Sequence, residues 1–218
     1  LSGYYKINKT HSIGGAVKFF SLGEITFTDA SGNVIRDDKP SEFELAAAYA
    51  FRLSDRMSIG INGKFAYSNL TGGLTVAGVN TKPGIVGATD LSFSYNNDDA
   101  RIGKTDGTYM FAATINNIGN KVSYSELSAQ DFIPMNLKIG NSFKADFDKF
   151  NSVTFSLDIQ RLLVPTPAYY DLIDGEYVML SGMSNDVGVI SGMVQSFYDA
   201  PGVVATDDNG DYIQNSDG

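Results

Sequence analysis

Seven charged side chains share even numbering within stretches that are otherwise small and apolar. They are Glu44, Arg52, Lys64, Asp90, Lys138, Lys144 and Asp158. Since both signs are present, these side chains can pair with one another or line a hydrated passage. A charge that faced hydrocarbon would cost about 2–4 kcal/mol. Their common even numbering therefore predicts that all seven lie on one hydrated face of a β-sheet. Ion pairing is the simpler role for them, and a transport pathway is the other.

Catalytic and metal-binding residue types are scarce. The chain has no cysteine and one histidine, His11, which excludes thiolate sites, disulfides and sites with several histidines. A Ser–His–acid set would have to use His11, which has no adjacent candidates, and no nucleophile-elbow pattern occurs. The sequence predicts no enzyme, no metal site and no cofactor.

Composition narrows the class of protein further. The 218 residues include 16 Lys and Arg against 25 Asp and Glu, a net charge of -9, so a nucleic-acid partner is not expected. The 23 glycines and 43% hydrophobic residues suit a β-rich chain with many turns. No run of apolar residues is long enough for a transmembrane helix.

In the segments that carry the seven charges, apolar residues alternate with small or polar residues, with a period of two. Between Phe43 and Leu53 the odd positions are large and apolar, whereas the even positions are small or charged. Similar or weaker patterns predict eight strands, near residues 1–7, 13–21, 43–53, 57–68, 85–95, 109–115, 137–147 and 153–159.

The length of these stretches favours a membrane. Most run for about ten residues, as transmembrane β-strands do, whereas average globular strands have about 5–6. We therefore expect the apolar side chains to face lipid and the polar ones to face a lumen. A soluble β-sandwich or a lipocalin-like barrel, with the apolar face packed inside, is the alternative.

Short and long connections alternate along the chain. Short links are expected at 8–11, 54–56 and 148–151, with a somewhat longer one at 96–107; long links are expected at 22–42, 70–84 and 119–131. This alternation is typical of bacterial outer-membrane barrels, with short periplasmic turns and long extracellular loops. We expect barrel strands with loops over 1–162 and a long extracellular loop region, without a clear strand, over 163–218.

The predicted topology places both chain ends on the long-loop side. Bacterial single-chain barrels have even strand numbers and normally keep both termini in the periplasm. The sequence is therefore expected to be an internal piece of a longer single-domain barrel, with an odd number of strands missing at each end. A complete eight-stranded barrel is the alternative.

One helix is expected, over 185–198 in the last long loop. Its apolar stripe is a candidate partner-binding surface, together with the residue that follows it: Val187, Ile190, Val194, Phe197 and Tyr198. Ser184 or Asn185 would cap its start. The stripe either faces a partner or the barrel mouth, or packs against its own barrel.

Several stretches, in order along the chain, resemble the PorV (LptO) family of outer-membrane barrels from the type IX secretion system of Bacteroidetes. These stretches are Phe20–Phe27, Ser68–Gly73, Ile115–Gly119, Asp131–Pro134 with Asn136 and Leu137, Leu163–Pro167, and Gln195–Phe197 with Asp199–Gly202. The resemblance implies a FadL-like barrel of fourteen strands, which would leave three strands missing at each end.

The resemblance also implies a function. The family binds the large type IX translocon protein and secreted proteins with a C-terminal sorting domain, and it passes this cargo to a surface attachment protease. Outer-membrane lipid would be a further partner. Two alternatives remain: a FadL-like transporter for hydrophobic small molecules, and a lipid deacylase, for which His11 is the only histidine available.

Overall fold

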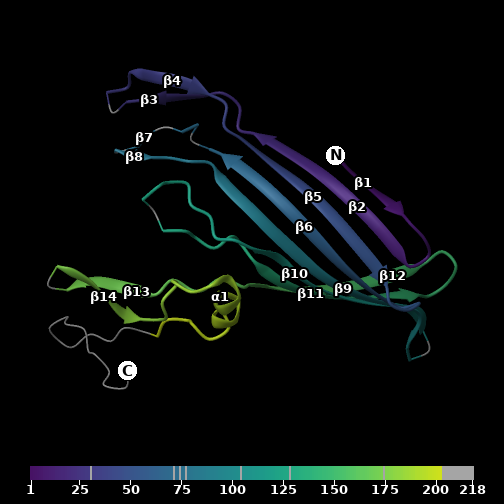
Figure 1. The fold of residues 1–218 in the computed structure, drawn as a ribbon. Coiled ribbons are helices and arrows are strands. Elements are labelled where there is room, and N and C mark those ends of the chain that lie inside the picture. Colours follow the sequence, from purple (N-terminus) through teal and green to yellow (C-terminus); the bar gives the residue numbers. More distant parts are fainter. Residues whose placement is uncertain are drawn as a thin grey trace. The chain divides into compact units, whose positions relative to one another are not determined.

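A computed structural model describes residues 1–202 except 30, 71, 74, 77, 104, 128 and 174. By its contacts the chain divides into two compact units, Leu1–Arg161 and Leu162–Gly218. The first unit contains an eight-stranded antiparallel sheet whose strands follow chain order (Figure 1). Its strands are β1 (Ser2–Lys6), β2 (His11–Ser21), β5 (Ser41–Arg52), β6 (Met57–Asn69), β9 (Gly84–Ile102), β10 (Thr105–Gly119), β11 (Asn136–Asp146) and β12 (Ser152–Leu162).

The all-β antiparallel architecture predicted from the alternation is confirmed, and each of the eight expected strands is present. The sheet is open, because β1 and β12 lie at its two edges and are not hydrogen-bonded to each other. The link expected at 96–107 is wrong: β9 and β10 continue into it, and Arg101 lies opposite Asp106. Polar side chains fill this part of the hairpin, so the backbone ladder extends where the apolar alternation stops.

Three small two-stranded hairpins complete the β-structure. They are β3 (Ile25–Thr28) with β4 (Val34–Asp38), β7 (Thr75–Val76) with β8 (Val79–Asn80), and β13 (Tyr169–Ile173) with β14 (Glu176–Ser181). The last hairpin corrects the expectation that no strand follows Leu162. An Asp-Gly pair at 174–175 was the available signal, and Gly175 has a φ of 85°, as such a turn requires.

The two faces of the main sheet differ in chemistry and in exposure. Along β6 the odd-numbered side chains up to Phe65 are exposed, and the even-numbered ones are half-buried. On β12 the odd-numbered Phe155, Leu157 and Ile159 are 72%, 64% and 63% exposed. Within the described residues, the apolar face, defined by the odd-numbered side chains, is therefore largely exposed and not packed in a core. This arrangement agrees with a lipid-facing surface and not with the sandwich alternative. The even-numbered side is called the polar face below.

The helix α1 (Val189–Gln195) is shorter than expected. Its N-cap is Gly188, in an extended conformation, and no side chain caps it, so the expected cap at Ser184 or Asn185 is wrong. The Ser184 hydroxyl instead accepts a hydrogen bond from the Asp186 backbone N–H at 3.1 Å. Within the described residues, no helix has the length and apolar character needed to cross a membrane.

Candidate functional site

The most enclosed charged contact of the polar face joins β6 to β9. Lys64 Nζ lies 2.7 Å from Asp90 Oδ2, and the two side chains are 19% and 15% exposed. Asn62 Nδ2 donates to Asp90 Oδ2 at 2.9 Å, and the Asn117 backbone N–H donates to Asp90 Oδ1 at 2.8 Å. Both carboxylate oxygens are therefore satisfied, which offsets the desolvation of this half-buried pair.

Asn117 links this ion pair to the next long connection. It lies in a bulge of β10 between Ile115 and Ile118, and its φ is 61°, a value that asparagine tolerates better than most residues. Its side chain accepts a hydrogen bond from Lys64 Nζ at 2.9 Å and donates one to the Pro134 carbonyl at 3.1 Å. Through these hydrogen bonds, Asn117 connects both ends of the segment 118–134 to the Lys64–Asp90 ion pair on the polar face.

Of the other predicted charges, Glu44 lines an open pocket of about 490 Å³ together with Lys64 and Asp90, whereas Arg52, Lys138, Lys144 and Asp158 lie outside it. Their ion-pair contacts are Lys18–Glu44 at 3.0 Å, Lys138–Asp158 at 3.3 Å, Lys144–Asp146 at 2.7 Å and Arg52–Asp55 at 3.5 Å. Lys18 and Asp146 were not among the seven predicted charges, although their even numbering within predicted strands was a usable signal. The contacts support pairing as the role of these charges, and their position in a lumen stays a prediction.

The long connections of the first unit are hydrogen-bonded to one another. Lys82 N donates to the Tyr124 carbonyl at 2.9 Å, and Glu126 N donates to the Asn80 carbonyl at 3.2 Å. On β4, Arg36 Nη2 donates to the Gly72 carbonyl at 2.6 Å. The connections 22–40, 70–83 and 120–135 therefore form one linked loop layer at the same end of the sheet (Figure 1).

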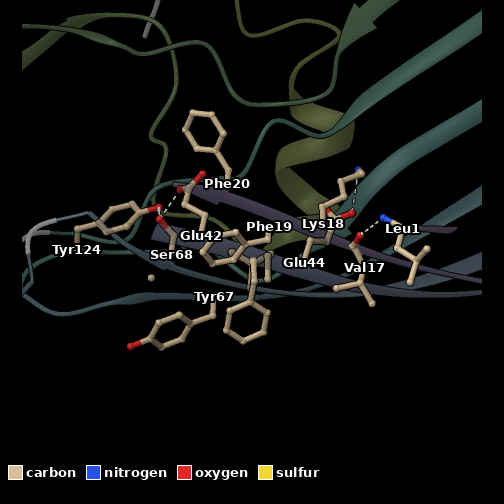
Figure 2. Close-up of a pocket in the computed structure, with 14 residues that line it drawn as sticks. Leu1, Val17, Lys18, Phe19, Phe20, Glu42, Glu44, Tyr67, Ser68 and Tyr124 are labelled. Atoms are coloured by element: carbon tan, nitrogen blue, oxygen red, sulfur yellow. Dashed lines mark hydrogen bonds and ion pairs between the residues drawn. The ribbon is translucent and has the colours of Figure 1, made fainter. Parts of the chain in front are cut away.

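Beneath this loop layer lies an open cavity of about 660 Å³, lined by polar-face side chains around Glu42, by Tyr124 of the loop layer, and by Phe19, Phe43 and Tyr67 of the apolar face. Figure 2 shows Tyr124 reaching Ser68, which in turn reaches Glu42. Tyr124 Oη donates to Ser68 Oγ at 3.0 Å, and Ser68 Oγ donates to the Glu42 carboxylate. A Cβ on Gly84 would lie 2.8 Å from Tyr124 Cε1, so the close approach of the tyrosine ring requires glycine there. Phe20 and Val86 supply apolar lining.

In the second unit, two stretches of the family resemblance meet. The Asp199 carboxylate is 1% exposed and accepts hydrogen bonds from the backbone N–H and the hydroxyl of Thr166. Close by, Ser181 Oγ donates to the Gly202 carbonyl at 3.0 Å. Leu163–Pro167 and Asp199–Gly202 are therefore joined by a buried contact that their separation in the sequence does not reveal.

The candidate partner-binding residues lie on and around α1. Ile190 and Val194 belong to the helix and are 64% and 57% exposed, Phe197 and Tyr198 follow it at 55% and 65%, and Val187 is half-buried before it. Gln195 is buried, and its Nε2 donates to the Ser184 carbonyl at 3.0 Å. The apolar stripe is thus largely open to solvent, and its binding role stays a prediction.

His11 has aromatic neighbours instead of a catalytic set. Its Nδ1 is hydrogen-bonded to the Tyr49 hydroxyl, and its ring centroid lies 4.8 Å from that of Phe51. Among the described residues, no group of three or more His, Asp or Glu side chains is arranged to hold a metal ion.

Comparison with known proteins identifies the family. No curated protein matches the chain. The family model described as "Type IX secretion system protein PorV" matches residues 1–169, which is well over half of the chain. The matched region spans the complete eight-stranded sheet and the loop layer. The chain therefore belongs to the PorV family of type IX secretion system proteins.

Proposed function

We propose that this protein is a non-enzymatic outer-membrane component of the type IX secretion system. It binds the large translocon protein and secreted cargo carrying a C-terminal sorting domain, and it passes the cargo to the surface attachment protease. The observation that carries the proposal is the exposed apolar face of the sheet, combined with long connections that share one end of it. In a barrel, that end faces the cell exterior.

The linked loop layer supports a binding role. Its connections are held by backbone hydrogen bonds and by Arg36, so a partner would meet a largely preorganised surface. Preorganisation lowers the entropy cost of association. The stripe on α1 adds exposed apolar and aromatic side chains, of the kind enriched at interface cores.

Substitution on α1 of the full-length protein tests the contact. Ile190→Asp places a charge in the stripe, and Ser191→Asp places the same charge at the next exposed helix position, outside the stripe. We expect Ile190→Asp to reduce co-purification of the translocon protein and cargo by about tenfold or more, because a buried unpaired charge costs several kcal/mol. Ser191→Asp is expected to leave co-purification unchanged. Equal recovery with both variants would reject the stripe as the contact.

A FadL-like transporter for hydrophobic small molecules is the second candidate. The open cavity under Tyr124 favours it, because apolar side chains and a few polar groups line it, as in small-molecule sites. Uptake of such molecules by cells with and without the full-length protein separates the candidates. Uptake that depends on the protein, with secretion intact in its absence, would support the transporter.

A further inference from the structure

Glu42 differs from four other carboxylates of the polar face, because it has no ion-pair partner among the described residues. Glu44, Asp90, Asp146 and Asp158 each form an ion pair with a lysine. For Glu42, the contact found within the described part of the chain is the hydrogen bond from Ser68, and no cation lies within ion-pair distance. A half-buried carboxylate with one neutral donor retains the capacity to bind a cation.

An aromatic ring lies beside this carboxylate. Phe20 is directly opposite Glu42 in the β2–β5 register. In Figure 2 its ring projects to the same side of the sheet as Glu42 and Tyr124, whereas Tyr67 projects to the other side. The face of an aromatic ring attracts a cation within about 6 Å of its centroid. A carboxylate and a ring at one site therefore favour an organic ammonium group.

The charge balance of the cavity points the same way. Lys18 also lines it, but its ammonium lies 3.0 Å from Glu44. The pair is close to neutral, so among the described residues Glu42 is the lining carboxylate that has no ion-pair partner. Val86, on the same face, adds apolar surface next to the polar groups, as in small-molecule sites.

We propose that the polar-face side of this cavity binds a primary alkylammonium group. The ammonium contacts the Glu42 carboxylate and the Phe20 ring, and the alkyl chain lies against Phe20 and Val86. Free alkylamines and lipids with an ethanolamine head group share this chemistry. The proposal is independent of the proposed role in secretion, since it concerns the polar face beneath the loop layer.

Titration of the full-length protein in phosphatidylcholine nanodiscs tests the proposal. The probes are hexylammonium, hexanoate and hexanol, which share a chain length but differ in charge, and heat is measured by calorimetry. We expect hexylammonium to bind and the other two not to bind. Glu42→Gln should weaken hexylammonium binding by about tenfold or more. The control, Glu24→Gln, alters an exposed loop carboxylate paired with Lys39 and should have no effect.

Two further variants guard against misfolding. Glu42→Asp keeps the charge and should retain most of the binding, and Phe20→Leu should weaken it several-fold by removing the ring face. Equal binding of hexanol and hexylammonium, or unchanged binding in both Glu42→Gln and Phe20→Leu, would overturn the proposal.

Native mass spectrometry distinguishes the two sources of the ligand. Retention of phosphatidylethanolamine over phosphatidylglycerol that is lost in Glu42→Gln would identify the lipid head group. Binding of hexylammonium without such retention would identify a free amine. Absence of both would reject the site.

Discussion

Thr166 holds both carboxylate oxygens of Asp199. Its backbone N–H donates to Oδ2 at 2.7 Å and its hydroxyl donates to Oδ1 at 2.8 Å. The contact joins the segment before β13 to the segment after α1, and so it closes the intervening chain into a loop. Since two-stranded hairpins and seven-residue helices are marginal alone, this buried contact is a main constraint on the second unit.

Removing the Thr166 hydroxyl should loosen the second unit. Thr166→Val keeps the shape but leaves Asp199 Oδ1 without its donor, at an expected cost of about 1–3 kcal/mol. Hydrogen exchange of the full-length protein measures the effect, as faster exchange of amides between residues 166 and 199. Thr28→Val, at an exposed position of β3, is the matched control. Unchanged exchange in Thr166→Val would show that the contact does not hold this unit together.

Breaking the ion pair between β6 and β9 should destabilise the sheet. Asp90→Ala leaves Lys64 without its charge partner, and we expect a loss of about 2–3 kcal/mol in the free energy of unfolding, because both side chains are mostly shielded from solvent. Denaturant unfolding of the full-length protein provides the measurement. Lys18→Gln, which breaks a pair whose lysine is 73% exposed, should cost under about 1 kcal/mol. Similar losses for the two variants would contradict this ranking.

Gly84 is predicted to be essential for docking Tyr124. Gly84→Ala would place a Cβ 2.8 Å from the tyrosine ring, and overpacking of this kind costs about 1–3 kcal/mol. Gly3→Ala is the control, because nothing lies within 4 Å of the added Cβ. In the double variant Gly84→Ala with Tyr124→Ser, we expect the cost of the alanine to fall, since the clash is relieved. Additive losses in this cycle, measured by denaturant unfolding, would exclude the clash as the cause.

The turn between β11 and β12 should respond to acid. Hydrogen bonds from the Asn151 side chain and the Phe150 backbone N–H hold the pKa of Asp148 below its ordinary value of 3.8. The stabilisation is therefore present above pH 3.8 and is lost as the pH falls below it through the lowered pKa. In Asn151→Ala the pKa of Asp148 should rise towards the ordinary value. A carboxyl-carbon NMR titration of the full-length protein measures both pKa values, and an identical value in the variant would refute the assignment.

The main sheet could be predicted from the sequence because the signal is local. Side chains of a strand alternate between two faces, so the run from Phe43 to Leu53 shows its strand character without knowledge of its neighbours. The same alternation identified the polar positions of Glu44, Lys64 and Asp90. It failed at 96–107, where polar side chains continue the ladder and backbone pairing alone defines the strands.

Which side chains contact one another, and which segments are joined by those contacts, depended on the tertiary structure. The sequence by itself determined the strand content, the chemistry of the two faces and the alternation of short and long connections, because these follow from residue order and backbone geometry. Only the folded chain decided that Lys64 meets Asp90 and Asn117, that Tyr124 covers Gly84, and that Asp199 is buried against Thr166. The physical reason is that these contacts depend on register, on the bulge at Asn117 and on loop paths set by many distant interactions.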